Sequence, residues 1–125
     1  RSVLPSMIRQ HSGSIITTSS IWGLTGASCE VPYSAAKAGI IGLTKALAKE
    51  VGPSGIRVNC IAPGVVDTEM NGALGQEVMD QLREETPLCT IGTPQQIAQV
   101  SLFLAGEQAS FVTGQVISPN GGFFC

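Results

Sequence analysis

Residues 33–64, YSAAKAGIIGLTKALAKEVGPSGIRVNCIAPG, largely decide the fold of this chain. Alanine, isoleucine and leucine recur through residues 33–51, which predicts a helix that ends at Gly52-Pro53. Residues 57–62, RVNCIA, closed by Pro63-Gly64, predict the next strand. A helix that leads directly into such a strand is the connection found between parallel strands, so the stretch indicates an α/β fold.

The segments before this stretch also alternate between helix and strand. Residues 3–9 have the pattern of the end of a helix, and SIITTS at 14–19 is β-branched and predicts a strand. Residues 21–32 contain two glycines and a proline, so we expect a loop there. The long helix would then start at about Tyr33.

The segments after the stretch continue it to the end of the chain. Residues 76–85 predict an amphipathic helix. Thr93 and Gln96 have the spacing of a capping box, which predicts a second helix that ends at Gly106. Residues 115–118 predict a last short strand. Strands that alternate with helices in this way build a parallel sheet with helical crossovers.

Composition narrows the possible partners. The chain has 125 residues, is 43% hydrophobic and 13% charged, and has a formal net charge of −2, which suits one well-buried domain. It has no basic run and no apolar stretch of membrane-spanning length, so we expect neither nucleic acid nor membrane as a partner. With one histidine, His11, and no closely spaced cysteine pair, we expect no metal site and no Ser-His-Asp relay. We expect reduced thiols in a cytoplasmic protein at Cys29, Cys60, Cys89 and Cys125.

One tyrosine and one lysine stand out as candidate acid–base groups. Tyr33 and Lys37 are four residues apart, which places both side chains on one face of the predicted helix. A phenol beside an ammonium is a proton donor, because the cation stabilises the phenolate that is left. Ser20 and Pro63-Gly64 each follow the carboxyl end of a predicted strand, where open α/β sheets bind their ligands.

This ordered set resembles the short-chain dehydrogenase/reductase family, which has a Rossmann-like doubly wound parallel sheet. The resemblance implies that the Ser20 hydroxyl hydrogen-bonds a substrate carbonyl, that Tyr33 donates a proton to it and that Lys37 assists. Negative charge develops on the carbonyl oxygen during reduction of a ketone, so two hydroxyl donors and a cation suit that reaction. The catalytic residues that we expect are Ser20, Tyr33 and Lys37.

The motif PGVVDT at 63–68 resembles the turn of this family that contacts the nicotinamide ring. By this resemblance the Val66 amide would bond the carboxamide, Thr68 would contact the amide or a phosphate, and Lys37 would bind the ribose hydroxyls. The expected cofactor is NADP, with NAD as a possibility. The expected cofactor-binding residues are Tyr33, Lys37, Pro63, Gly64, Val66 and Thr68.

Five nearby residues have other expected roles. The pair Gly23 and Gly26 lacks the third glycine of a phosphate-binding fingerprint, so we expect it to make the loop beside the substrate flexible. Ser19 is expected to be structural, and Asn59 to hydrogen-bond neighbouring backbone. Trp22 has two interpretations, a wall of the substrate pocket or an anchor in the core.

The resemblance covers the chain from residue 1 to 125 and matches strands 5–7 of the family's sheet with their helices. We therefore expect the C-terminal catalytic part of a single Rossmann-type domain, without the N-terminal dinucleotide-binding half. The family's glycine-rich turn and its catalytic asparagine both precede the matched region. The first strand would then have an unpaired edge, and this piece alone is expected to bind cofactor poorly and to aggregate or stay partly disordered.

Several substrates and functions remain open. The motifs GIRVNCIAPGVVDTEM and GLTKALAKE resemble the 3-oxoacyl-acyl carrier protein reductases of fatty acid biosynthesis, which implies a small or carrier-bound ketone substrate and a homotetramer for the full-length protein. The motif SSIWGLTGASCEVPYSAAKAG also resembles bacterial reductases that act on 5-aminopentanone-modified elongation factor P. A third interpretation is an inactive fragment or a non-catalytic binding module on the same scaffold.

Overall fold

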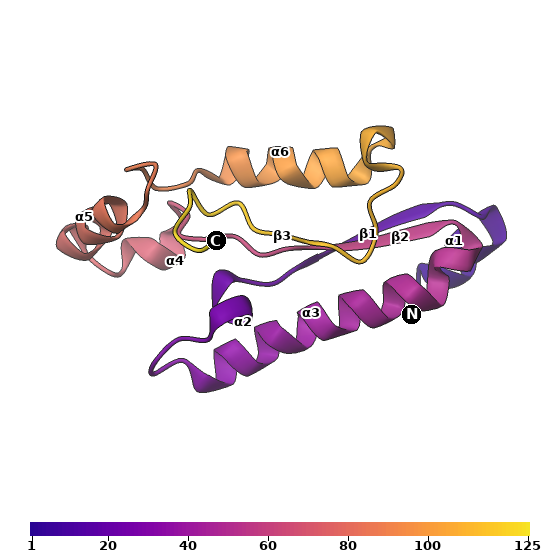
Figure 1. Ribbon diagram of the computed structural model, residues 1–125, viewed down its shortest axis with the longest axis horizontal. Helices are drawn as coiled ribbons and strands as arrows, with labels where there is room; N and C mark the ends of the chain where they lie inside the picture. The colour runs from indigo at the N-terminus through magenta and orange to yellow at the C-terminus, as the bar shows by residue number, and fades with distance from the viewer.

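Three parallel strands form the centre of the computed structural model, which describes residues 1–125. Their order is β1 (Gly13–Thr18), β2 (Ile56–Ile61) and β3 (Val116–Ile117), so β2 lies between the other two (Figure 1). The predicted parallel α/β sheet is thus confirmed. The predicted strand bounds, 14–19, 57–62 and 115–118, each differ from these by one residue at either end.

Helices cover both faces of this sheet. Figure 1 shows α3 (Val31–Val51) along one face and α6 (Pro94–Ala105) along the other. The predicted bounds of α6 are confirmed. The remaining helices are α1 (Leu4–Gln10), α2 (Ile21–Thr25), α4 (Glu69–Gly72) and α5 (Gln76–Glu85), with 3₁₀ turns at Gly52–Ser54 and Glu107–Ala109.

The alternating side chains of β2 explain why both faces are covered. Ile56 and Val58 point to one face, where they pack against Ala48 and Val51 of α3. Ile61 points to the other face and packs against Leu104 of α6. Successive side chains of a strand point to opposite faces, so a strand covered on both sides needs apolar residues on both. The other two side chains of β2 on the face of Ile61, Arg57 and Asn59, are polar and donate to the Leu104 and Val112 carbonyls.

Local signals set the helix ends. The capping box predicted at the start of α6 is present: the Thr93 Oγ1 accepts from the Gln96 amide at 3.3 Å, and the Gln96 Oε1 accepts from the Thr93 amide at 2.8 Å. The predicted bounds of α5 are confirmed. Helix α3 begins at Val31, two residues before the predicted start, because Pro32 fits the first turn of a helix, where its missing N–H is not needed.

The prediction of a loop over residues 21–32 is wrong for its first part, where Ile21–Thr25 form the helix α2. Ser20 caps this helix and the Ile21 side chain is buried, so a cap and one core contact stabilise a turn that the local sequence favours only weakly. The rest of the segment, between α2 and α3, is a loop as expected.

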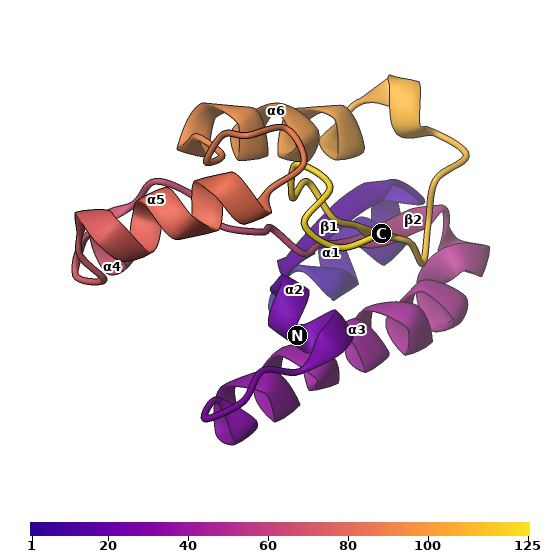
Figure 2. The same cartoon turned by 60° about the vertical axis from the view of Figure 1, so that its left-hand side comes forward.

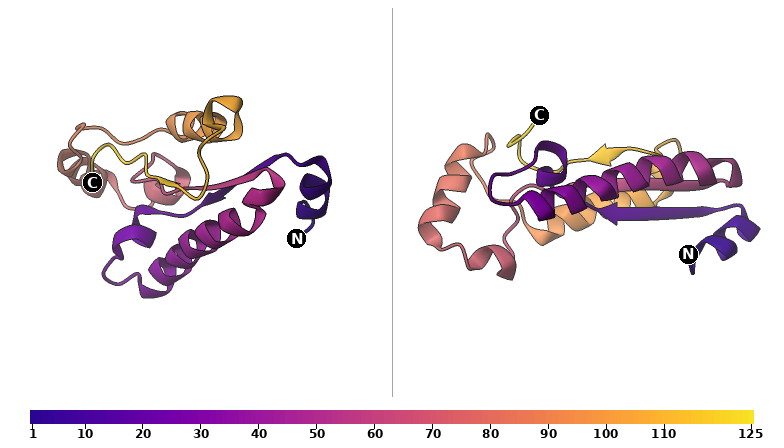
Figure 3. Two further views of the ribbon diagram at one scale, coloured as in Figure 1. Left: turned by 45° about the vertical axis from the view of Figure 1, so that its right-hand side comes forward. Right: turned by 90° about the horizontal axis from the view of Figure 1, so that it is seen from below.

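The first strand lies at one edge of the sheet. β1 pairs with β2 along its whole length, from Gly13 opposite Ile56 to Thr18 opposite Ile61, and no strand pairs with its other side. The edge position of β1 is seen from below in Figure 3. The expectation of an unpaired edge at the first strand is confirmed. None of the helices is both long enough and apolar enough to cross a bilayer.

Candidate active site

The candidate site lies where β1 and β2 end. Thr18 and Ile61 are paired at the carboxyl ends of these strands, so the segments that follow them start side by side. The Ser19 amide donates to the Ile61 carbonyl at 2.8 Å, and the Ile21 amide donates to the Pro63 carbonyl at 3.1 Å. These two hydrogen bonds hold the predicted catalytic serine segment against the predicted cofactor turn.

Ser20 is nearly buried between these segments, at the start of α2. Its Oγ accepts a hydrogen bond from the Trp22 amide at 3.2 Å. The side chain makes no other hydrogen bond within the protein, so its hydroxyl proton remains free to be donated. An oxygen that accepts from an amide and keeps a free proton is a suitable donor to a ligand oxygen.

Tyr33 and Lys37 meet on one face of α3, as their spacing predicts. The Lys37 Nζ lies 5.5 Å from the centre of the Tyr33 ring, within the range of a cation–π contact. The same Nζ donates to the Thr18 carbonyl at 3.3 Å, which leaves two of its three protons without a partner. The Tyr33 side chain is 39% exposed and its hydroxyl forms no hydrogen bond within the protein.

The contact between α2 and α3 sets how Ser20 lies relative to this pair, and Figure 2 shows the two helices side by side. The Ser19 Oγ donates to the Lys37 carbonyl at 2.8 Å, which confirms the structural role expected for Ser19. A Cβ at Gly23 would lie 2.5 Å from the Ser19 Oγ and 2.8 Å from the Lys37 carbonyl carbon. The expectation that Gly23 makes a loop flexible is therefore wrong, because this glycine lies in a helix and allows α2 to approach α3 closely.

The predicted cofactor turn follows β2. A Cβ at Gly64 would lie 2.7 Å from the Cβ of Asn120, and the Gly64 amide donates to the Pro119 carbonyl at 3.2 Å. Gly64 is therefore required by the C-terminal segment that crosses it, which is a reason that the sequence pattern did not indicate. Pro63 precedes it at the end of β2, where its carbonyl holds the Ile21 amide.

Val66 and Thr68 continue this turn toward α4. Val66 forms an isolated parallel bridge with Gly92, and its carbonyl accepts from the Asn71 Nδ2 at 2.7 Å. The Val66 amide makes no hydrogen bond within the protein. Thr68 is exposed at the start of α4, and its hydroxyl also has no partner within the protein. Both groups are thus available to a ligand.

Asn59 confirms the structural role expected for it. Its side chain is fully buried in β2, where its Nδ2 donates to the Val112 carbonyl at 2.8 Å and its Oδ1 accepts from the Gln115 amide at 3.1 Å. These bonds hold the segment that leads into β3.

Sequence reasoning missed the contribution of the chain's last residues. The rings of Trp22 and Phe123 are 6.2 Å apart between centres and nearly perpendicular, at 78°. This edge-to-face contact brings the C-terminal segment onto the helix that Ser20 caps. The only local signal for it is Asn120-Gly121-Gly122, which is typical of a turn but does not indicate where the turn packs.

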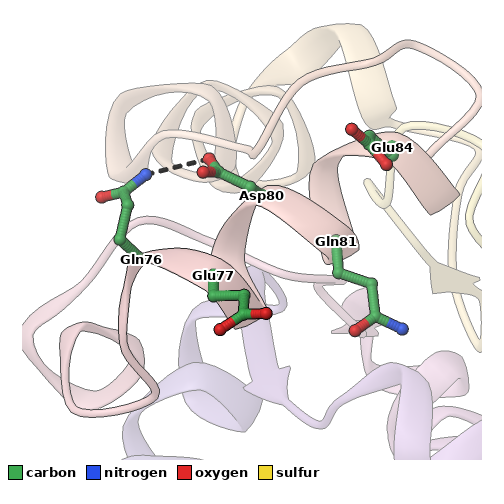
Figure 4. A pocket seen from close by; sticks show the side chains of 5 residues that line it. All are labelled: Gln76, Glu77, Asp80, Gln81 and Glu84. Atoms are coloured by element: carbon green, nitrogen blue, oxygen red, sulfur yellow. Dashed lines mark hydrogen bonds between the residues drawn. The ribbon is translucent and has the colours of Figure 1, made fainter.

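A shallow depression on α5 lies away from these residues (Figure 4). Its lining side chains are all polar and come from this one helix; Figure 4 labels them as Gln76, Glu77, Asp80, Gln81 and Glu84. The Gln76 Nε2 donates to the Asp80 Oδ1 at 2.9 Å, so part of its polar surface is already paired. No group of His, Cys, Asp and Glu residues in the chain could hold a metal ion. All four cysteines are free.

Comparison with known proteins shows which family this chain belongs to. The family model described as "Enoyl-(Acyl carrier protein) reductase" matches residues 1–124. The chain is 50% identical to "Uncharacterized oxidoreductase YmfI" of Bacillus subtilis, over 100% of the chain and 52% of that protein. It is 51% identical to a 3-oxoacyl-[acyl-carrier-protein] reductase of Chlamydia muridarum, over 96% of the chain and 48% of that protein.

A solved structure has the same fold. A 3-oxoacyl-[acyl-carrier protein] reductase with bound NAD from Brucella melitensis superposes with a TM-score of 0.89 and 39% identity, over 100% of the chain and 46% of that structure. The chain thus spans about half the length of the relatives that it matches. From the matched family model, these relatives and the shared fold, the chain belongs to the short-chain dehydrogenase/reductase family.

Proposed function

We propose that the protein containing this chain is an NAD(P)H-dependent reductase that reduces the ketone of a 3-oxoacyl thioester, with Ser20, Tyr33 and Lys37 as its catalytic residues. One observation carries the proposal. The Ser20 hydroxyl proton, the Tyr33 hydroxyl and two protons of the Lys37 ammonium have no partner within the protein. Ser20 follows the carboxyl end of β1, Lys37 donates to the last carbonyl of that strand, and Tyr33 lies against Lys37. Free donors gathered at that end of a parallel sheet suit a ligand that gains negative charge on oxygen.

The proposed chemistry divides between these donors. A nicotinamide held beside these residues would supply the hydride that the carbonyl carbon takes up. The carbonyl oxygen gains the electron pair of the C=O π bond and takes a proton from the Tyr33 hydroxyl, which gives an alcohol. Ser20 donates a hydrogen bond to the same oxygen, and the Lys37 cation stabilises the phenolate that Tyr33 becomes.

The residues present fit a nicotinamide and its ribose. A carboxamide oxygen can accept from the Val66 amide, and the ribose hydroxyl oxygens can accept from Lys37; neither group's free protons are used within the protein. Thr68 would contact the carboxamide or a phosphate, and Pro63-Gly64 would shape the turn beside the ring. We infer NADP as the cofactor, with NAD as the alternative, which the NAD-bound relative supports.

We also infer the domain organisation, the oligomeric state and the location of the whole protein. We infer that residues 1–125 are the C-terminal catalytic part of one Rossmann-type domain. A homotetramer is supported by exposed apolar side chains on both helical layers, with Leu43 of α3 57% exposed and Leu102 of α6 75% exposed. Four free cysteines support a cytoplasmic location. A role in fatty acid biosynthesis would follow from a carrier-bound substrate.

The proposal is tested on the full-length protein with NADPH and two thioesters, acetoacetyl-coenzyme A and acetoacetyl-acyl carrier protein. Oxidation of NADPH is followed by absorbance, and turnover that requires Tyr33 is the expected result. Elongation factor P carrying a 5-aminopentanone group is the third substrate, because the sequence around residues 19–39 resembles the reductases of that ketone. Turnover of that substrate alone would replace the thioester assignment. Cofactor binding without turnover of any ketone would favour a binding module.

A further inference from the structure

We propose that Phe123 is a positioning residue that acts through Trp22 to orient the Ser20 hydroxyl; this rests on the proposed function. The two aromatic rings meet edge to face, 6.2 Å apart. Trp22 is in turn hydrogen-bonded to Ser20 through its backbone amide. The last residues of the chain are thus connected to the predicted oxyanion donor by one ring contact and one hydrogen bond.

The hydrogen bond between the Trp22 amide and the Ser20 hydroxyl fixes the direction of the serine proton. The Trp22 amide donates to the Ser20 Oγ at 3.2 Å and so occupies one acceptor position of that oxygen. The free proton must then point away from Trp22. A small shift of Trp22 changes this direction, and a donor is effective only when it is aimed at the oxygen on which charge develops.

The ring contact between Trp22 and Phe123 is needed because α2 has little stability of its own. The helix has five residues, Ile21–Thr25, of which only Ile21 is buried. A helix this short forms only when contacts outside it stabilise it. Trp22 is half-buried and its ring packs edge to face against Phe123, so this contact restrains the first turn of α2.

Hydrogen bonds of the turn at residues 120–123 hold the backbone of Phe123 in place. The Asn120 Oδ1 accepts from the Gly122 amide at 2.8 Å, and the Asn120 carbonyl accepts from the Phe123 amide at 3.1 Å. Gly121 and Gly122 have φ angles of 65° and 88°, which glycine adopts without strain. The turn is also fixed from outside, because the Gly121 carbonyl accepts from the Leu88 amide at 3.1 Å.

The pair of Trp22 and Phe123 lies outside the buried core, so its effect on the Ser20 hydroxyl can be separated from an effect on the stability of the whole fold. Neither Trp22 nor Phe123 belongs to the two buried clusters that hold α3 and α6 against the sheet. Both side chains are half-buried. Loss of the contact should therefore disturb the start of α2 while the sheet and the Tyr33–Lys37 pair remain in place.

The test compares Phe123→Ala with Phe123→Tyr and with Phe124→Ala in the full-length protein. Phe124 is the matched control, because it is the adjacent phenylalanine and its exposed ring has no aromatic partner. We expect Phe123→Ala to lower kcat about tenfold with an unchanged Kd for NADPH, since misaligned donors cost rate without loss of cofactor binding. Phe123→Tyr, which keeps the ring, should restore kcat, and Phe124→Ala should match the parent. An unchanged kcat for Phe123→Ala, or an equal loss for Phe124→Ala, would overturn the proposal.

A double-mutant cycle tests the route through Trp22, and Phe123→Leu, which keeps an apolar side chain without the ring, takes the place of Phe123→Ala in it if the alanine variant folds poorly. Trp22→Ala and Phe123→Ala should each lower kcat, and the double variant should lose no more than the larger single loss, because both remove one contact. Additive losses would contradict the proposed route through Trp22. Tyr33→Phe in the same preparation tests the proposed function separately: if Tyr33→Phe remains fully active, the function fails, whereas if only the Phe123 variants behave as the parent, the positioning role alone fails.

Discussion

The Lys37 ammonium lies 5.5 Å from the centre of the Tyr33 ring and is tethered to the Thr18 carbonyl at 3.3 Å. The tether comes from the last residue of β1, so the sheet itself sets the position of the cation. The Tyr33 hydroxyl has no such tether within the protein. The pair thus combines a fixed charge with a free hydroxyl, the arrangement expected of a proton donor that acts on a ligand.

Tyr33→Phe should abolish most ketone reduction and leave the fold intact. The hydroxyl has no partner within the protein, so its removal leaves no protein group unsatisfied. Loss of a general acid lowers rates by about 10²–10⁴-fold. The check is kcat for a ketone substrate, together with the circular dichroism spectrum and the midpoint of thermal unfolding. A parental kcat in a folded variant would exclude Tyr33 as the donor.

Lys37→Arg should also be damaging, although it keeps the positive charge. A guanidinium is larger and planar, so it cannot take the place of a compact ammonium that is bonded to the Thr18 carbonyl. We expect kcat to fall about tenfold or more and the KM for NADPH to rise, both from steady-state kinetics. Lys45→Arg, on an exposed part of the same helix, is the control and should leave both constants unchanged.

Ser20→Ala should reduce activity and stability together, because this residue has two roles. Loss of one donor to a developing oxyanion lowers kcat about 10²–10³-fold. Loss of the helix cap that holds the Trp22 amide costs about 1 kcal/mol of unfolding free energy. Ser19→Ala separates the two effects. It removes the bond from Ser19 to the Lys37 carbonyl, with a similar cost in stability, but leaves Ser20, the proposed donor to the substrate, in place. A loss of kcat for Ser19→Ala as large as that for Ser20→Ala would contradict this division.

Gly23→Ala should destabilise the protein by about 1–3 kcal/mol, measured by denaturant unfolding. The added methyl group would lie 2.8 Å from the Lys37 backbone and 2.5 Å from the Ser19 Oγ, so α2 and α3 would have to separate. Gly72→Ala in α4 is the control, since its Cβ would meet no atom within 4 Å. Alanine favours helix over glycine, so the control should be equal to the parent or more stable by up to about 1 kcal/mol. Equal stability of the two variants would show that the close approach at Gly23 is not required.

Asn59→Leu should cost about 1–3 kcal/mol of unfolding free energy and leave the KM for NADPH unchanged. Leucine has a similar size, but it leaves the buried Val112 carbonyl and Gln115 amide without their partner. The measurement is denaturant unfolding followed by circular dichroism, with cofactor titration on the folded protein. A neutral effect on stability would mean that other contacts hold the segment before β3.

Several elements could be predicted because their signals are local. The bounds of α5 and the capping box of α6 follow from side chains within a few residues of one another, and the spacing of Tyr33 and Lys37 alone placed them on one helix face. The alternation of strands and helices likewise indicated the parallel sheet. The sequence by itself therefore determined the order of the elements, the parallel sheet and the pairing of the tyrosine with the lysine.

Only the tertiary structure decided how the groups around Ser20 are held. The close approach of Gly23 to Lys37 and the contact between Trp22 and Phe123 join α2 to other segments of the chain, and the short helix depends on such contacts. Glycines are usual in turns, so the local pattern at Gly23 favoured a flexible loop, and nothing in it indicated that α3 would pass within contact distance. A contact between residues so distant along the chain as Trp22 and Phe123 has no periodicity in the sequence, and it forms only because the parallel strands β1 and β3 end on the same side of the sheet.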